Sequence, residues 1–234
     1  MNNNFDDIWE ENYSKGQALN KYPYGELVSI FFNSLKYATT PVEKILEVGC
    51  GAGNNLWFLG ELGFNTYGID GSETVVKKAK DACQLRGVKA DIRHGYFNSM
   101  PFEDDSMDMV IDRESICCGT KKIIKESLKE IKRVLKPNGI FITFRFNDGN
   151  PTLGLLKSGK LHGDKLEDRT YTNISKGTFH GIGAVNFVTL GEIKEQHDFL
   201  DIKFINEHAN KTIEDNSGES NFFYSEYILV GVKK

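Results

Sequence analysis

Three glycines spaced by one residue follow directly on a short apolar run, and this stretch carries the strongest chemical signal in the chain. The apolar run is Ile45 to Val48, and the glycines are Gly49, Gly51 and Gly53. Glycine lets a turn approach a ligand closely, because a side chain there would collide with it. The segment from Asn54 has helical spacing, so the N-terminus of that helix points at whatever lies over the turn.

A second signal is the acid that ends the next apolar segment, Asn65 to Asp70. An acid at the tip of a second strand can accept hydrogen bonds from both ribose hydroxyls of a nucleoside. The dinucleotide-binding pattern G-x-G-x-x-G would need a glycine where the chain has Asn54, so a dehydrogenase is disfavoured. The alternative is a glycine-rich loop in an unrelated α/β protein, with Asp70 only capping the helix that begins near Ser72.

The stretch from Glu47 to Gly53, E-V-G-C-G-A-G, resembles motif I of the class I S-adenosylmethionine methyltransferases. The segment 135–142, L-K-P-N-G-I-F-I, is similar to the turn L-K-P-G-G of that family, with Asn138 at the first glycine. The resemblance covers residues 42–146. It implies an α/β fold with a Rossmann-like, seven-stranded, doubly wound sheet. That sheet is mostly parallel with an antiparallel last strand, and helices cover both faces.

The resemblance also implies a cofactor, S-adenosylmethionine, with S-adenosylhomocysteine as its product and no metal. The segment from His94 to Phe102 would cradle the adenine, but Tyr96 replaces the usual acid and leaves the backbone N–H of Phe97 to read the ring. The cofactor-binding residues expected from the resemblance and the lid are Tyr13, Glu47, Gly49, Cys50, Gly51, Gly53, Asp70, Gly71, Ser72, Tyr96, Phe97 and Asp112.

Methyl transfer to an amine also requires a base, and charged residues follow the predicted strand from Ser106 to Asp112. Asp112 and Glu114 could take a proton there, and Arg113 could hold an anion. An ordinary solvated loop is an equally open interpretation for each of them. The candidate catalytic residues are Asp112, His180 and Tyr22.

Elements on either side of this core are expected to cover the site. Five aromatic residues lie in the segment 5–24, and a helix is expected from Glu26 to Tyr37. We expect this N-terminal arm, residues 1–40, to form a lid. Residues 41–234 would form the methyltransferase domain, with an insertion at 147–188 that caps the substrate as a hairpin. The alternatives are an aromatic plug that fixes the arm to the domain, and a cap without chemical importance. The five aromatic residues of the segment 5–24 are Phe5, Trp9, Tyr13, Tyr22 and Tyr24.

Hydrophobic periodicity predicts the remaining elements. Helices are expected from Ser72 to Gly87, from Lys121 to Lys136 and from Leu190 to Gln196, the last with a capping box of Thr189 and Glu192. Further strands are expected at 89–93, 140–146, 199–206 and 222–230, with a polar connection at 209–221.

Composition excludes several classes of protein. The net charge of −4 argues against a general nucleic-acid binder. The four cysteines form no C-x-x-C pair, so neither a zinc site nor a disulfide framework is expected. No apolar run approaches the roughly 18 residues that a membrane span needs, and residues 1–7 do not look like a signal peptide. A reduced, cytoplasmic setting is therefore expected, while the oligomeric state is left open.

The acceptor is predicted from the arm and the cap. Their segments 20–24 and 169–181 are similar to those of small methyltransferases associated with bacterial surface-polysaccharide (capsule) synthesis, some of which resemble phosphoethanolamine N-methyltransferases. Aromatic faces suit a methylated amine, and cations and tyrosines suit a phosphate. The expected substrate-binding residues are Tyr22, Tyr24, Arg113, Arg145, Arg169, Tyr171, Lys176 and His180. The alternatives are a sugar O-methyltransferase, for which a strict divalent-metal requirement would be diagnostic, and a non-enzymatic protein that binds S-adenosylmethionine.

Overall fold

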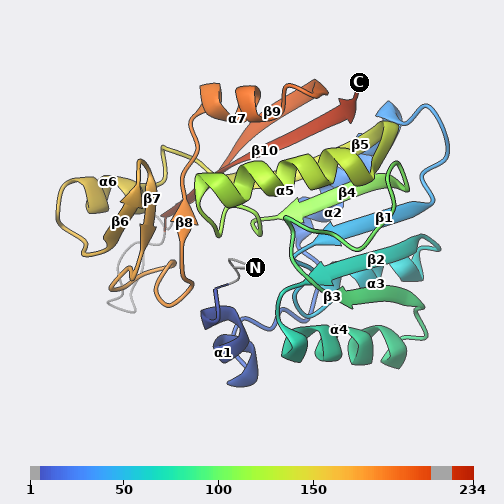
Figure 1. Cartoon of the computed structure of the whole chain (residues 1–234), viewed down its shortest axis with the longest axis horizontal. Coiled ribbons are helices and arrows are strands. Elements are labelled where there is room, and N and C mark those ends of the chain that lie inside the picture. The colour runs from blue at the N-terminus through green and yellow to red at the C-terminus, as the bar shows by residue number, and fades with distance from the viewer. Residues whose placement is uncertain (1–5, 212–222) are drawn as a thin grey trace.

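The computed structural model describes residues 6–211 and 223–234 of the chain. A seven-stranded sheet in the order β3-β2-β1-β4-β5-β10-β9 forms its centre (Figure 1). The strands are β1 (Lys44–Val48), β2 (Asn65–Asp70), β3 (Ala90–His94), β4 (Met107–Arg113), β5 (Leu135–Phe146), β9 (Leu200–Lys211) and β10 (Phe223–Lys233). Strand β10 runs in the opposite direction to the other strands of this sheet, which confirms the predicted fold class.

Helices cover both faces of the sheet because successive strand residues point to opposite sides. On β4, Val110 packs toward α5 (Lys121–Val134) and α7 (Leu190–Gln196). Met109 and Ile111 pack on the other face, toward α2 (Gly25–Ser34) and α3 (Asn54–Glu61). Helix α4 (Glu73–Leu85) lies on that same side over β2 and β3. The predicted helices at these places are confirmed, including the capping box of α7.

The predicted boundary at Lys136 is wrong by two residues. Helix α5 ends at Val134, and β5 begins at Leu135. Pro137 has no N–H and disfavours helical backbone at the residue before it, so the helix stops early. Asn138 then turns the chain with a φ of 63°.

The insertion after β5 is more elaborate than the predicted hairpin. It contains the helix α6 (Pro151–Lys157) and a small antiparallel sheet of β6 (Asp164–Glu167), β7 (Thr170–Thr172) and β8 (Val185–Asn186). A separate apolar core holds it together and includes Phe146 of β5 and Tyr224 of β10. We call residues 147–188 the cap.

The N-terminal segment differs from its prediction in two ways. Helix α1 (Ile8–Ser14) was not predicted, and the predicted helix 26–37 consists of α2 followed by a 3-10 turn, η1 (Leu35–Tyr37). In Figure 1, α1 lies below the cap and beside α4. The predicted connection at 209–221, the strand start at 222 and the aromatic residue Phe5 fall wholly or mostly outside the described residues.

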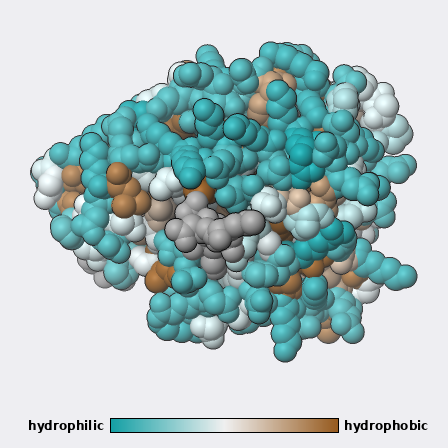
Figure 2. All heavy atoms as spheres, in the orientation of Figure 1, coloured by the Kyte–Doolittle hydropathy of each residue, from teal (hydrophilic) through white to brown (hydrophobic). Residues whose placement is uncertain are grey.

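The surface shown in Figure 2 is mostly hydrophilic, with hydrophobic residues scattered over it. Scattered apolar residues are normal on a folded protein and need no special explanation. None of the helices in the described part of the chain has both the length and the apolar composition required of a membrane span.

Candidate functional site

A cavity of about 280 Å³ lies at the carboxyl ends of β1, β2 and β4. This is the edge at which open α/β sheets bind ligands. The glycine turn and the segment 95–98 form one part of its wall, and α1, the loop after β4 and the cap form the rest. The cavity therefore joins segments that are far apart in the sequence.

The glycine turn is built so that backbone faces the cavity. Gly49 has a φ of +67°, and a Cβ on it would lie 2.2 Å from the Oγ of Ser115. The Ser115 hydroxyl instead donates a hydrogen bond of 3.2 Å to the carbonyl of Gly49. Any side chain at Gly49 would push the loop after β4 away from β1.

Asp70 fixes the same turn from the neighbouring strand. Its Oδ2 accepts a hydrogen bond of 3.0 Å from the Gly51 N–H, and its Oδ1 accepts one of 3.0 Å from the Ser72 N–H. Burial raises the pKa of Asp70 to about 6, and these two hydrogen bonds oppose that shift. Since Asp70 also lines the cavity, it positions the turn and presents a carboxyl group to a ligand.

Glu47 presents a buried acceptor to the cavity. Its Oε1 accepts a hydrogen bond of 2.6 Å from Asn55 Nδ2, whereas its buried Oε2 has no partner among the described residues. Burial raises the pKa of Glu47 to about 8. A buried carboxylate oxygen without a donor is costly, so this site suits a ligand that brings one, such as an ammonium group.

Helix α1 closes one side of the cavity and is held by contacts on two sides. The Glu10 carboxylate accepts hydrogen bonds from both side-chain hydroxyls at the start of α4, those of Ser72 and Thr74. On the other side, Asn12 Nδ2 donates a hydrogen bond of 2.8 Å to the Gly181 carbonyl in the cap. Tyr13, buried between these contacts, lines the cavity.

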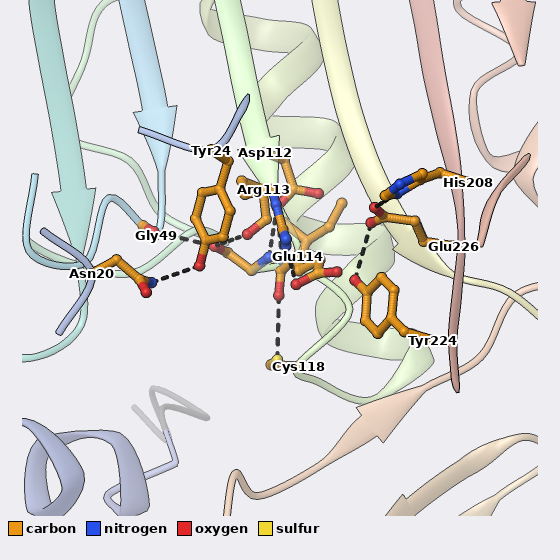
Figure 3. Close-up of polar contacts among 12 residues, drawn as sticks. Asn20, Tyr24, Gly49, Asp112, Arg113, Glu114, Cys118, His208, Tyr224 and Glu226 are labelled. Atoms are coloured by element: carbon orange, nitrogen blue, oxygen red, sulfur yellow. Dashed lines mark hydrogen bonds and ion pairs between the residues drawn. The ribbon is translucent and has the colours of Figure 1, made fainter. Parts of the chain in front are cut away.

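A cluster of charged residues lies at the other end of the cavity (Figure 3). Arg113 forms an ion pair with Glu114, and its guanidinium carbon lies 4.1 Å from the centre of the Tyr24 ring. Behind them, Glu226 is 1% exposed and accepts a hydrogen bond of 3.1 Å from the Tyr224 hydroxyl. Among the described residues, five charged side chains line the cavity. Four are acids, namely Asp6, Glu47, Asp70 and Glu114, and Arg113 is the fifth.

Most of the expected cofactor residues lie at the cavity wall, although their binding roles stay predictions. Those at the wall are Tyr13, Glu47, Gly49, Cys50, Gly51, Asp70, Gly71, Tyr96 and Phe97. Gly53 and Ser72 lie outside it: Gly53 packs against Ala79, and the Ser72 hydroxyl caps α4 by accepting a hydrogen bond from the Val75 N–H. Both support the turn from behind.

Asp112 is not placed where a base would act, which corrects one prediction. It is fully buried and absent from the cavity wall. Its Oδ1 accepts hydrogen bonds from the N–H groups of Ser115 and Ile116, and its Oδ2 accepts one of 2.7 Å from the Thr143 hydroxyl. With both oxygens occupied, Asp112 shapes the loop after β4 and is not available to a ligand.

Most of the cations predicted to bind a phosphate, at loop ends or in the cap, do not meet at the cavity. Arg145 is buried and lies 3.3 Å from Gln196 and 3.4 Å from Asn186, while Arg169 is engaged by Asp168 and Glu192. Tyr171 is buried in the apolar core of the cap, whereas Lys176 and His180 are exposed. None of these side chains lines the cavity, and neither does Tyr22, which is 72% exposed. Of the predicted substrate residues, only Tyr24 and Arg113 do.

Sequence reasoning missed several residues of the wall or the cluster behind it. Trp9, Phe146, Phe179 and Tyr224 line the cavity, and Glu226 lies behind Glu114. Glu226 is a charged residue in the mostly apolar run 223–230. This contrast was a signal for a special role, because a buried strand rarely carries an unpaired charge. Among the described residues, no group of three or more His, Cys, Asp or Glu side chains could hold a metal ion.

Comparison with known proteins connects this geometry to a family. Residues 46–143 match the family described as "Methyltransferase domain". The uncharacterized methyltransferase YodH of Bacillus subtilis is 32% identical over 107 residues, which cover 46% of this chain and 45% of YodH. The 24-methylenesterol C-methyltransferase 2 of Arabidopsis thaliana is 33% identical over 109 residues, which cover 45% of this chain and 30% of the relative. The chain thus spans less than half the length of these relatives.

Solved structures extend the likeness over the whole fold. A SAM-dependent methyltransferase from Methanosarcina mazei superposes with a TM-score of 0.70 at 21% identity, covering 91% of this chain and 98% of that one. At this identity the likeness concerns the fold alone.

Proposed function

We propose that this chain, which carries the domain and fold of a class I S-adenosylmethionine-dependent methyltransferase, transfers methyl groups to the nitrogen of a small amine. The observation that carries the proposal is the cavity itself. It runs from the glycine turn to Glu114 and is lined by carboxylates and aromatic rings.

The residues of the glycine half fit the family's cofactor, S-adenosylmethionine. Asp70 would accept hydrogen bonds from ribose hydroxyls, and the unpartnered Oε2 of Glu47 would accept one from the ammonium group. The segment 95–98 would cover the adenine, with Phe97 offering an apolar ring. When bound, the cofactor supplies an electrophilic methyl group on a positively charged sulfur, whose bond to the methyl carbon breaks as the acceptor's bond forms.

The chain contributes alignment, exclusion of water and removal of a proton. Tyr13 and Trp9 of α1 cover the cavity from one side, and Phe179 and Ile182 of the cap cover it from another. We therefore assign α1 the role of a lid and residues 147–188 the role of an acceptor cap.

The acceptor half favours an amine. An ammonium ion is attracted by carboxylates and by aromatic faces, and this half offers Glu114, Tyr24, Phe146 and Phe179. A phosphorylated amine such as phosphoethanolamine was the predicted acceptor, but Arg113 is the one cation among the described cavity residues, and it is already paired with Glu114. We therefore propose an acceptor whose recognition does not depend on a phosphate. A function in surface-polysaccharide modification stays a prediction.

The test is a release assay for S-adenosylhomocysteine with ethanolamine, phosphoethanolamine and their N-methyl derivatives beside a panel of nucleotide sugars. We expect turnover on amines, with the phosphate giving no gain in kcat/KM. Turnover restricted to sugars would contradict the amine assignment. Binding of the cofactor without turnover on any of these compounds would favour the non-enzymatic alternative.

A further inference from the structure

Two glutamates from distant parts of the chain meet at the acceptor end of the cavity. Glu114 follows β4 and lines the cavity, and Glu226 lies behind it on β10. Glu114 has a φ of 57°, which is uncommon for a residue other than glycine. Backbone strain of this kind is often found at functional sites.

The two carboxyl groups lie close enough for the charge of Glu226 to raise the pKa of Glu114. Two adjacent buried carboxyl groups disfavour ionisation of both, so such a pair holds one proton. Arg113 occupies Oε2 of Glu114, whereas the buried Oε1 accepts no hydrogen bond from any described donor. Glu226 instead receives two contacts, from the Tyr224 hydroxyl at 3.1 Å and from Nδ1 of His208 at 3.0 Å. At rest the pair therefore carries one proton and one negative charge, and Arg113, Tyr224 and His208 stabilise that charge.

A connected path leads from this pair to the surface. His208 lies on the edge strand β9, and its side chain is 26% exposed, whereas that of Glu226 is 2% exposed. Figure 3 shows Glu226 between Tyr224 and His208, on the side away from Tyr24. An imidazole can accept a proton on one ring nitrogen and release one from the other, so a histidine can pass protons between two partners.

We propose that Glu114 and Glu226 remove the ammonium proton of the acceptor amine and pass it through His208 to solvent. The inference rests on the proposed function. It goes further by naming the base, the exit route and the charge state in which the acceptor arrives.

Every proton taken up along this route is also released. The O–H bond of Glu114 breaks as one forms on Glu226, and Glu114 then takes a proton from the ammonium, whose N–H electrons become the attacking lone pair. Glu226 gives its proton to the imidazole of His208, which releases one to water. One proton leaves for each methyl group transferred, and the pair returns to its resting state.

Several groups set the proton affinity of this pair. They are Asp112 and Arg113 of β4, Tyr24 and Glu26 at the start of α2, Tyr224 on β10 and His208 on β9. Burial and the charge of Glu226 raise the pKa of Glu114, and the charge of Arg113 lowers it. Removing the charge of Glu226 should therefore lower the pKa of Glu114.

The first experiment uses the full chain without cofactor or acceptor. Infrared difference spectra at neutral pH should show the C=O stretch of a protonated carboxyl group that Glu226→Gln abolishes, although Glu114 is still present. Glu207→Gln is the matched control, because Glu207 is an exposed glutamate next to His208 on β9. A band that Glu226→Gln leaves unchanged would refute the shared proton, whatever the protein methylates.

The second experiment follows methylation of the best amine from the panel. We expect Glu226→Gln to lower kcat at least about tenfold and to move the acidic limb of the kcat/KM profile about one pH unit lower. We expect His208→Ala to lower kcat by a similar factor and added imidazole to restore much of it. A purely structural role for His208 would give no rescue and would overturn the route. Absence of turnover on any amine, with the infrared band present, would refute the proposed function and leave the acid pair intact.

Discussion

Glu47 and Asp70 are both buried acids at the glycine turn, but they differ in what their oxygens contact. Asp70 accepts hydrogen bonds from two backbone N–H groups, so much of its function is to hold the turn in place. Glu47 leaves one buried oxygen without a partner among the described residues. The unpartnered oxygen destabilises the protein without ligand, and a ligand that donates a hydrogen bond to it removes this destabilisation.

This difference gives a prediction for pH and for Glu47→Gln. The pKa of Glu47 in the folded chain, about 8, lies above its ordinary value of 4.5, so the folded protein holds a proton that the unfolded chain has lost between these values. The free energy of unfolding of the cofactor-free protein should therefore fall as pH rises from about 4.5 to 8. Glu47→Gln should flatten that slope and weaken S-adenosylhomocysteine binding at pH 8 by about 10- to 100-fold.

Calorimetric titration and denaturant unfolding measure the two effects. Glu43→Gln is the control, because Glu43 is an exposed acid four residues earlier. Equal affinity of Glu47→Gln and the unchanged protein would show that Glu47 does not contact the cofactor.

At the scale of elements, the strand–turn–helix unit depends on close packing between the glycine turn after β1 and the loop after β4, which meet at Gly49. We expect Gly49→Ala to destabilise the fold by more than about 1–2 kcal/mol and to abolish cofactor binding, because the new Cβ collides with Ser115. Gly87→Ala separates the two causes: Gly87 has a similar φ of +71°, but a Cβ there meets nothing within 4 Å. Gly87→Ala should lower the free energy of unfolding only through its backbone conformation and should leave cofactor binding normal. If Gly49→Ala and Gly87→Ala lowered the melting temperature and the cofactor affinity equally, the proposed collision at Gly49 would be contradicted.

The elements that hold the cofactor half were predictable because their signals are local. Gly49, Asp70 and Ser72 lie within one strand–turn–helix–strand unit, and their spacing alone indicates their positions. The acceptor half was not predictable in this way. Glu114 and Glu226 are 112 positions apart, and only the pairing of β10 with β5 brings them together.

The positions of the predicted substrate residues in the cap were unpredictable for a related reason. Arg169 and Lys176 are polar residues in an insertion, and nothing in the sequence indicates which side of the cap they occupy. Arg169 forms ion pairs on the side of α7, and the face toward the cavity is aromatic. Composition predicted an ordered insertion after β5 but could not give its orientation.

At the scale of the whole molecule, the cap and the sheet share one wall. Phe179 of the cap is 2% exposed, lines the cavity and lies 4.7 Å from Phe146 of β5, measured between ring centroids. We expect Phe179→Ala to cost about 3–5 kcal/mol of stability and to raise the acceptor KM much more than the cofactor Kd. Leu155→Ala, on the exposed side of α6 in the same cap, is the control. A rise in the cofactor Kd of the same size would show that the cap acts on both halves.

Helix α1 contacts the start of α4 through Glu10 and the cap through Asn12. In the function that we propose, this one element would cover the entrances of both ligands. Its consequence is kinetic: the two ligands cannot enter independently once this helix is in place. We expect a compulsory order in which the cofactor binds first and S-adenosylhomocysteine leaves last, with its departure limiting steady-state turnover. Glu10→Ala, compared with Glu11→Ala on the exposed side of α1, should relax the order toward random and speed that departure. Product-inhibition patterns and a pre-steady-state burst would reveal the difference.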